Sequence, residues 1–422
     1  MKKEELKKNP KRKIISVTGT KGKTTIVRLL DEVYKSLGEE TLRVDNDGYF
    51  FNGKIQGDSD WSLEQFGSIP TICPGKFLLS LKNKPKALAI FEVSVGSSGL
   101  SGLGYLWHSI GIFTNVYEDH ITGRRIKNRN DILDAKSFIA KRIRPNGSAI
   151  LNGDDKYVAK SIKDIPEYAR SVFYGITLAA IDKKKCLAKG SILITLEDSW
   201  VVAKQKSKTQ KLVNIEKVPF TFGGRYAPSV YNVLAVCAAV YSDHNGHFPK
   251  KAKIAIESYT QDKDGGRLVV LKKKKRTIIL DFAHEKHSLR EVFRLGKTLG
   301  RNCYGVIRLD SSRNNDVVEK TGAYIAKNAD EFFVWDKIDG VRSKKFSIDL
   351  APEFSRQIGE TSKLLTNAIH SSGGKATNCL QEEKSIFSAL KASQPGDSIV
   401  IIVGDDKEYT MKALSSALAR VS

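Results

Sequence analysis

A short glycine- and lysine-rich segment near the start of the chain has the residue types that bind phosphate. Residues 17–25 read Val-Thr-Gly-Thr-Lys-Gly-Lys-Thr-Thr. Backbone N–H groups at the start of a helix can hold phosphate oxygens, Lys23 can neutralise the terminal phosphates, and the Thr24 hydroxyl can ligate Mg²⁺. The usual pattern has a glycine where this chain has Val17, so the motif is a shorter variant. The predicted nucleotide-binding residues here are Gly19, Thr20, Lys21, Gly22, Lys23, Thr24 and Thr25.

Two later segments add carboxylate and imidazole groups that suit a metal ion. Glu92 directly follows the apolar run 87–91, and Asp119 and His120 follow the apolar run 110–116. Sheets of α/β proteins bind ligands at the carboxyl ends of their strands, so we expect these side chains near the phosphate loop. Carboxylate oxygens are ligands that Mg²⁺ prefers. We therefore predict a role for Glu92 and His120 in binding a nucleotide and its metal ion.

The elements that must position these groups alternate between strand and helix patterns. Residues 24–37 carry apolar side chains at helical spacing and stop at Gly38, which predicts a helix with one buried face. The predicted strands of this region are 14–17, 87–91, 110–116 and 148–151. This alternation is typical of a mostly parallel sheet covered by helices, so the predicted fold class is α/β.

The rest of the chain predicts an insertion and a second domain. Shorter β-rich runs at about 171–222 predict a small antiparallel insertion, and a helix follows at 230–241. The glycine pair and polar residues of 262–267 indicate an interdomain hinge, so we expect domains at 1–264 and 265–422. The second domain is predicted to be Rossmann-like, with strands at 277–283, 304–309, 331–335 and 398–403 and helices near 287–299, 316–327, 382–393 and 409–419.

The composition is that of a folded, basic protein. The 422 residues correspond to two or three domains, and 41% hydrophobic and 28% charged residues exclude wholesale disorder and collagen-like repeats. The net charge of +23 attracts phosphates, polyacids or acidic membrane surfaces. Five scattered cysteines favour neither a disulfide framework nor a zinc site, so we expect a reducing cytoplasm. We expect neither a signal peptide nor a transmembrane helix, since no apolar run reaches about 18 residues.

Together, these motifs resemble the Mur ligases, the ATP-dependent amide ligases that also include folylpolyglutamate synthase and the second half of cyanophycin synthetase. The resemblance covers essentially the whole chain, because many family motifs occur in the family's order. They are the loop at 19–25, Glu92 with Ser97 and Ser98, Thr114 to His120, Lys136, the Leu-Asn-Gly-Asp-Asp segment at 151–155, Tyr231 with Asn232, Gly266 with Arg267, and Asp281 to His284. Such an ordered series is far more specific than any one motif.

The resemblance implies a fold and a reaction. The implied fold is a central phosphate-loop ATPase domain followed by a Rossmann-like domain. Family enzymes transfer the γ-phosphate of ATP to a substrate carboxylate, and an amine or amino acid then attacks the acyl phosphate to form an amide. Two Mg²⁺ ions suit this reaction, with Mn²⁺ as the alternative, because charge must be neutralised on the phosphoryl group and on the carboxylate.

The resemblance also implies roles for individual residues. Catalytic roles fall to Lys23, Lys136 and His120, and Lys136 matches a lysine that family members carbamylate. Thr24 and Glu92 would ligate the ATP-bound ion, and His120 the second ion. On the nucleotide and substrate side, the implied contacts are Asn232 with adenine, Arg267 and Asp281 with the nucleotide after domain closure, and His284 and Arg313 with substrate.

Departures from the family pattern bear on the substrate. The phosphate loop begins at Gly19, which leaves no room for the domain that binds the UDP carrier in peptidoglycan ligases, so we do not expect a UDP-muramoyl substrate. Glu285 and Lys286 replace the usual Asn-Pro after His284, and Ser229 replaces the first asparagine of an Asn-x-x-Asn pair. The spelling of several motifs is most similar to the ligase half of cyanophycin synthetase, without its ATP-grasp half. We therefore expect an acidic peptide or polymer as the carboxylate substrate.

Two alternative functions remain open from the sequence. The Glu-Asp-His spelling at 118–120 is similar to that of poly-γ-glutamate ligases. Folylpolyglutamate synthase shares the Gly-Thr-Lys-Gly-Lys start of the loop but normally continues Gly-Ser where this chain has Thr24 and Thr25. A basic nucleic-acid-stimulated NTPase would also use many lysines and arginines. No known nucleic-acid-binding motif supports that second class, and aromatic residues are not interleaved with the basic runs, so a nucleic-acid partner is not expected.

Overall fold

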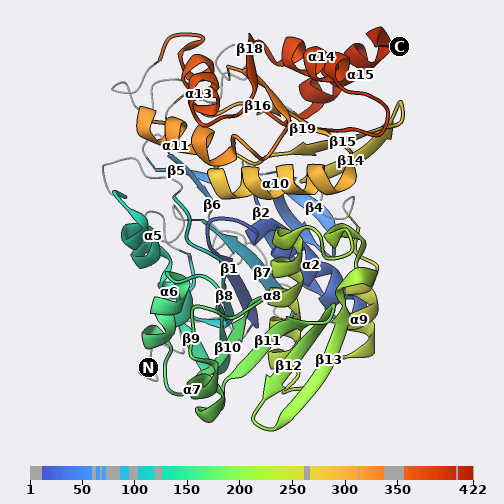
Figure 1. The fold of residues 1–422 in the computed structure, drawn as a ribbon. Coiled ribbons are helices and arrows are strands. Elements are labelled where there is room, and N and C mark those ends of the chain that lie inside the picture. Colours follow the sequence, from blue (N-terminus) through green and yellow to red (C-terminus); the bar gives the residue numbers. More distant parts are fainter. Residues whose placement is uncertain are drawn as a thin grey trace. The chain divides into compact units, whose positions relative to one another are not determined.

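The computed structural model describes residues 12–58, 63–66, 69–72, 86–94, 103–118, 126–260, 267–311, 313–336, 356–404 and 407–421. The chain divides into two compact units, Met1–Lys263 and Asp264–Ser422 (Figure 1). Each unit has its own sheet and its own hydrophobic core. The phosphate loop and most of the predicted site residues belong to the first unit.

The first unit is built on a sheet that has 11 strands in the described part of the chain, in the order β13-β12-β11-β10-β9-β8-β1-β7-β2-β3-β4. The strands from β11 to β2 are parallel, and an antiparallel hairpin extends the sheet at each edge. A separate antiparallel pair is formed by β5 (Leu63–Phe66) and β6 (Ile69–Ile72). The strands of the main sheet are β1 (Ile14–Thr18), β2 (Thr41–Asp45), β3 (Gly48–Phe51), β4 (Lys54–Asp58), β7 (Leu88–Val93), β8 (His108–Phe113), β9 (Ile143–Asn152), β10 (Arg170–Tyr174), β11 (Ile192–Glu197), β12 (Trp200–Gln205) and β13 (Lys208–Asn214).

Strand β1 lies at the centre of this sheet and is buried on both faces. Ile15 and Val17 belong to the core that contains the helices α2 (Lys23–Ser36) and α8 (Ala227–Asp243), whereas Ile14 packs into the core of the opposite face. A strand covered on both faces needs apolar residues at successive positions, which explains the continuous apolar run in the sequence. The predicted α/β fold class is confirmed.

Helices cover the sheet of the first unit. The N-terminal helix α2 buries Ile26, Leu30 and Val33 and stops just before Gly38, whose φ is +91°. Helix α8 is rich in alanine and valine and is buried along most of its length, because it packs against both α2 and the sheet. The other helices in the described residues of this unit are α5 (Arg129–Lys136), α6 (Phe138–Lys141), α7 (Lys183–Ala188), α9 (Lys250–Glu257) and the 3₁₀ turns Val158–Asp164, Ile215–Lys217 and Pro219–Thr221.

The segment 171–222 is β-rich, as predicted, but it is not a separate antiparallel insertion. Its strands continue the main sheet, with β10 and β11 parallel to β9 and only β12 and β13 antiparallel. The short helix α7 connects β10 to β11 and permits the parallel connection. Because this crossover helix has only 6 residues and is rich in lysine, its apolar signal was too weak to be recognised in the sequence.

The second unit is a mostly parallel sheet of order β14-β15-β19-β16-β17-β18 with helices on both faces, which confirms the predicted Rossmann-like architecture. Ile278 and Leu280 pack towards α14 and α15, whereas Phe293 of α10 packs on Phe332 from the other face, with ring centroids 5.2 Å apart. Its elements are β14 (Leu268–Lys273), β15 (Arg276–Asp281), α10 (Lys286–Leu299), β16 (Cys303–Ile307), α11 (Asn315–Ile325), β17 (Glu331–Trp335), α13 (Glu360–Ser371), β18 (Ala376–Leu380), α14 (Glu382–Ala392), β19 (Ser398–Ile402) and α15 (Lys407–Arg420).

Two expectations about the chain's general character can be compared with the structure. Cys186, Cys237, Cys303 and Cys379 all carry free thiols. Among the helices that the structure describes, none combines the length and the apolar character needed to cross a bilayer.

Candidate active site

The phosphate loop connects β1 to α2 through two glycines with positive φ. Gly19 has φ +141° and Gly22, the N-cap of α2, has φ +85°. A Cβ atom at Gly19 would lie 1.8 Å from Thr114 Oγ1, and one at Gly22 would lie 2.6 Å from Asn232 Oδ1. Both positions therefore require glycine for space as well as for backbone conformation. No side chain makes a cap hydrogen bond at the α2 N-terminus, and the first backbone N–H groups of such a helix suit an anion.

Thr114 and Asn115, which follow β8, make hydrogen bonds with the backbone of this loop. The backbone N–H of Thr20 donates to Asn115 O at 2.9 Å, and the N–H of Lys21 donates to Asn115 Oδ1 at 2.8 Å. The Thr114 hydroxyl donates to Lys21 O at 2.7 Å. Thr114 and Asn115, which belong to one of the family motifs in the sequence, therefore fix the conformation of the loop.

Three side chains with complementary chemistry meet at the carboxyl ends of β1 and β7. The Thr24 hydroxyl donates to Glu92 Oε2 at 2.7 Å, and Lys23 Nζ lies 3.8 Å from Glu92 Oε1. Lys23 Nζ also donates to Thr20 O at 3.1 Å. Glu92 is only 1% exposed, so its charge is compensated by these two neighbours rather than by bulk water.

This donor set fits Mg²⁺. A hydroxyl and a carboxylate supply two oxygen ligands, and Mg²⁺ in nucleotide sites typically combines one or two protein oxygens with phosphate oxygens and water. Within the described residues no three His, Cys, Asp or Glu side chains gather as a self-sufficient metal site. Thr24 and Glu92 thus fit an ion that takes its other ligands from phosphate and water. His120 and Asp119, like Ser97 and Ser98, lie outside the described residues.

Lys136 contacts the phosphate loop directly. It is the last residue of α5 and is 3% exposed, and its Nζ donates to Gly19 O at 3.0 Å. This buried ammonium group therefore holds the backbone of the loop at Gly19. The expected carbamylation of this lysine remains a prediction.

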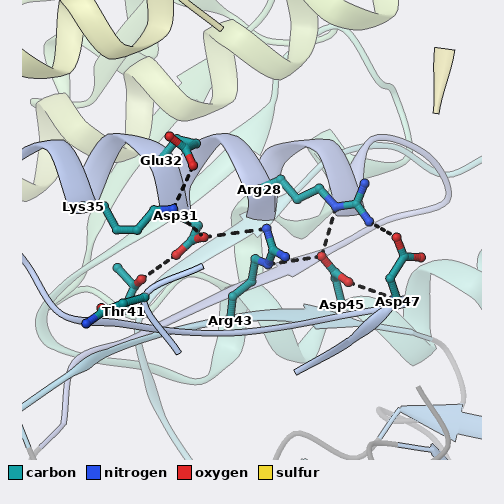
Figure 2. Close-up of polar contacts among 9 residues, drawn as sticks. Arg28, Asp31, Glu32, Lys35, Thr41, Arg43, Asp45 and Asp47 are labelled. Atoms are coloured by element: carbon teal, nitrogen blue, oxygen red, sulfur yellow. Dashed lines mark hydrogen bonds and ion pairs between the residues drawn. The ribbon is translucent and has the colours of Figure 1, made fainter. Parts of the chain in front are cut away.

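A buried ion-pair network joins α2 to β2 beyond the phosphate loop (Figure 2). Arg28 Nε donates to Asp45 Oδ2 at 3.1 Å, and the same guanidinium pairs with Asp47. Arg43 Nη1 lies 3.6 Å from Asp31 Oδ2, and its Nε lies 3.3 Å from Asp45 Oδ2. The Asp45 side chain is fully buried and the Arg28 side chain is 4% exposed. The network fixes the helix that carries Thr24 to a neighbouring strand of the sheet.

The Leu-Asn-Gly-Asp-Asp segment links the loop support to the rest of the unit. Asn152 Nδ2 donates to Thr114 O at 2.8 Å. Asp155 Oδ2 accepts a hydrogen bond from Val116 N at 2.9 Å. The sequence offered this motif only as part of a family pattern, because contacts between separate loops leave no local signal.

The remaining predicted residues divide between the two units. Asn232, on α8, is 8% exposed and lies against Gly22, as described above.

Asp281 ends β15, and its Oδ1 accepts a hydrogen bond from Ala283 N at 2.7 Å. His284 Nδ1 donates to Phe282 O at 2.9 Å. Arg267 immediately precedes β14, and the backbone N–H of Arg313 donates to Asp310 O at 3.2 Å. The nucleotide and substrate roles of these residues remain predictions.

The unusual Glu285 has a structural explanation. It is the N-cap of α10, and its carboxylate accepts hydrogen bonds from His287 N at 2.9 Å and Ser288 N at 2.6 Å. The side chain thereby satisfies two of the N–H groups that a helix start leaves without a partner. The departure from Asn-Pro preserves the helix start after His284.

Comparison with known proteins places the chain in a family. A model described as the Mur ligase middle domain matches residues 17–240. A cyanophycin synthetase from Nostoc sp. is 24% identical over 405 residues, which cover 95% of this chain and 42% of that protein. A UDP-N-acetylmuramoyl-L-alanyl-D-glutamate–2,6-diaminopimelate ligase from Bacillus cereus is 23% identical, over 94% of this chain and 73% of that protein. The chain thus spans less than half the length of the cyanophycin synthetase.

Solved structures show the same fold. A bifunctional folylpolyglutamate synthase/dihydrofolate synthase with Mn, AMPPNP and L-glutamate bound superposes with a TM-score of 0.65 at 15% identity, covering 98% of this chain and 92% of that chain. At this identity the likeness establishes the fold alone. The matched family model, however, spans more than half of the chain and includes the phosphate loop, Glu92 and Asn232. The chain belongs to the Mur ligase family.

Proposed function

We propose that this protein is an ATP-dependent ligase that joins a carboxylate substrate to an amine or amino acid through an acyl phosphate, with release of ADP and phosphate. The observation that carries the proposal is the group formed by Thr24, Glu92 and Lys23 beside the glycine-rich loop, with a hydroxyl–carboxylate distance of 2.7 Å and an ammonium 3.8 Å from the same carboxylate. Membership of a family of ligases supports the reaction class.

The reaction has two balanced steps. In the first step a carboxylate oxygen attacks the γ-phosphorus, and the bond to the oxygen that bridges the β- and γ-phosphates breaks, so ADP leaves. In the second step the amine nitrogen attacks the acyl carbon and loses a proton, and phosphate leaves with one oxygen of the original carboxylate. Positioning and charge neutralisation supply most of the catalysis in phosphoryl transfer.

The residues of this chain act by binding and orientation. The α2 N-terminus and Lys23 would hold and neutralise the phosphates. Thr24 and Glu92 would hold one Mg²⁺ ion, which supplies charge neutralisation when bound, and Mn²⁺ is the alternative ion. A second ion near His120 remains part of the proposal.

Lys136 is the proposed site of carbamylation, which would convert a cation into a metal-directed anion. Its Nζ donates to Gly19 O at 3.0 Å. A carbamate nitrogen keeps one hydrogen, so this contact is compatible with both forms of the side chain.

The proposed carboxylate substrate is an acidic peptide or polymer. The net charge of +23 supports this assignment, because a basic protein attracts polyanions over long range at low ionic strength. The similarity to cyanophycin synthetase over 95% of this chain points in the same direction.

The test is a screen of acidic oligopeptides and amino acids for ADP formation, with products identified by mass spectrometry. We expect ADP to form only when a carboxylate substrate and an amine are both present. With a substrate labelled with ¹⁸O in its carboxylate, one labelled oxygen should appear in the released phosphate. ADP formation that needs only DNA or RNA, or phosphate without the label, would contradict the proposal.

A further inference from the structure

The Asp154 carboxylate, in the loop after β9, accepts hydrogen bonds from the segment 176–179 and from Tyr231 on α8. Its Oδ2 accepts hydrogen bonds from Ile176 N at 2.6 Å, Thr177 N at 3.1 Å and the Tyr231 hydroxyl at 2.9 Å. Its Oδ1 accepts one from Ala179 N at 2.9 Å. Burial alone would raise the pKa of this carboxyl, but the hydrogen bonds outweigh burial and leave the pKa below its ordinary value. Asp154 is therefore an anion at neutral pH.

Tyr231 connects Asp154 to α8 through its hydroxyl group. The helix starts at Ala227 with no side chain capping its N-terminus, so local capping does not fix how this end is rotated. Tyr231 lies in the second turn, and successive helix residues point about 100° apart. When the Tyr231 hydroxyl is bonded to Asp154, the direction of the next side chain, Asn232, is set as well.

Asn232 is the residue that meets the phosphate loop. Its Oδ1 lies 2.6 Å from the position that a Cβ atom on Gly22 would take, and the side chain is 8% exposed. A small rotation of α8 would move this amide relative to the start of α2. The position of Asn232 thus depends on a hydrogen bond that neither it nor the loop makes.

The segment that contains Asp154 is also linked to the phosphate loop, through Asn152 and Thr114. Asn152 Oδ1 accepts a hydrogen bond from Asp154 N at 2.9 Å, and Asn152 Nδ2 donates to Thr114 O at 2.8 Å. Thr114 in turn bonds Lys21 O at 2.7 Å. Asn152 therefore supports the phosphate loop and Asp154 holds α8, so one short segment fixes both elements through separate hydrogen bonds.

We propose that Asp154 and Tyr231 are positioning residues for the base side of the nucleotide site: they orient Asn232 and thereby set the affinity for the base and the preference for adenine, without acting on the phosphates. This inference rests on the proposed function and on the predicted contact of Asn232 with adenine. If Asp154 and Tyr231 only stabilised the fold, a buried apolar contact could hold α8 equally well. Such a contact would not fix the direction of the Asn232 side chain.

The test compares Tyr231→Phe with Tyr241→Phe in the full-length chain. Tyr231→Phe removes only the hydroxyl that bonds Asp154. Tyr241→Phe makes the same chemical change about 15 Å further along α8 and serves as the matched control. Calorimetry with Mg²⁺ would measure binding of three probes: ADP, GDP and inorganic tripolyphosphate.

We expect Tyr231→Phe to weaken ADP binding about tenfold and to reduce the preference for ADP over GDP. Without the hydroxyl, Asn232 must be ordered when the nucleotide binds, and the strength of a hydrogen bond to a charged group limits that cost to about this factor. Tripolyphosphate binding should not change, and Tyr241→Phe should behave as the wild type. Unchanged ADP binding and selectivity in Tyr231→Phe would overturn the inference, and so would an equal loss of ADP and tripolyphosphate binding.

Asp154→Asn provides a second variant, should Tyr231→Phe fail to fold: it removes the charge, and its amide NH2 group cannot accept the hydrogen bonds that one carboxylate oxygen accepts. It should show the same loss of ADP binding and selectivity with tripolyphosphate binding retained. If instead the wild-type chain binds tripolyphosphate but no adenine nucleotide, the proposed function itself fails, and this inference fails with it.

Discussion

The Thr24 hydroxyl and the Glu92 carboxylate are hydrogen-bonded at 2.7 Å although they are 68 positions apart in the chain. The sheet register explains the contact, because Val17 of β1 pairs with Glu92 of β7 and α2 begins just after β1. The start of a helix and the end of a parallel strand therefore meet at one sheet edge. Such an edge is where an α/β fold can bring phosphate, metal ion and substrate together.

Lys23→Ala should abolish ligase turnover, by about 10³-fold or more, because it removes the cation that neutralises the terminal phosphates. The fold should persist at lower stability, since Lys23 lies outside the apolar core but Glu92 loses one of its partners. ADP formation and thermal unfolding would be measured side by side. Lys35→Ala on the same helix is the control and should retain turnover, and wild-type activity in Lys23→Ala would refute the assigned loop.

Glu92→Gln should raise the Mg²⁺ concentration needed for half-maximal activity and lower the maximal rate by about 10²-fold, because an amide oxygen binds a hard cation more weakly than a carboxylate does. Activity would be titrated with Mg²⁺ and then with Mn²⁺. Chelation by EDTA should stop ADP formation by the wild type. A Mg²⁺ dependence identical to that of the wild type would remove Glu92 from the ion site.

Gly22→Ala and Gly38→Ala separate backbone strain from the local contact. Both glycines have positive φ, +85° and +91°, so each substitution should cost about 1 kcal/mol of stability. Only at Gly22 does the new Cβ meet another residue, Asn232 Oδ1 at 2.6 Å, whereas nothing lies within 4 Å at Gly38. Gly22→Ala should therefore weaken ATP binding at least tenfold while Gly38→Ala leaves it unchanged. Equal effects on binding would show that the contact with Asn232 is unimportant.

Arg28→Met should destabilise the first unit by about 3 kcal/mol, because it leaves the fully buried Asp45 with one cationic partner fewer. Urea unfolding of the full chain, followed by circular dichroism, would measure the change. Lys204→Met is the control, because its partner Glu197 is 43% exposed, and it should cost less than about 1 kcal/mol. Similar costs for the two variants would argue against a strongly coupled buried network.

His108 should make the first unit less stable in mild acid. Burial lowers its pKa to about 4, and the charges of Arg142 and Arg144 act in the same direction, although the hydrogen bond to Ile139 O opposes them. Between pH 6.5 and 4 the unfolded chain binds a proton that the folded chain does not, so stability falls as pH falls. The contribution between pH 7 and pH 5 is about 2 kcal/mol.

His108→Gln removes the titrating group and keeps a donor near the Nε2 position, which bonds Ile139 O at 2.9 Å. The unfolding free energy of the wild type minus that of the variant should therefore fall by about 2 kcal/mol from pH 7 to pH 5. A difference that does not vary with pH would show that His108 does not titrate as expected.

The strand, loop and helix around the phosphate site could be predicted from sequence because their signals are local. The apolar run at 14–17 became β1 (Ile14–Thr18), and the helical pattern at 24–37 became α2 (Lys23–Ser36). The same holds for β15 to β17 and β19 in the second unit, where buried strands are continuous apolar runs. Types of element were therefore recovered wherever burial alone determined the residue choice.

Strand β2 was missed for a physical reason. Its positions facing α2 include Arg43 and Asp45, whose charges are compensated by Arg28 and Asp31 on that helix. A charged residue predicts exposure unless its partner is known, and the partner comes from another element. The contacts of Asn115 and of Asp154 were missed for the same reason, because they depend on segments that meet only in the folded chain.

The bonds from Asn115 to the backbone of Thr20 and Lys21 have a consequence for the energetics of ligand capture. A glycine-rich segment would ordinarily lose much conformational freedom when it wraps around an anion. Here the backbone N–H groups of Thr20 and Lys21 donate to the backbone carbonyl and the side chain of Asn115, at 2.9 and 2.8 Å, and these bonds within the protein hold the loop in shape. The loop therefore loses little further conformational entropy when it binds phosphate. Most of the attraction between the loop and the phosphate then contributes to the affinity.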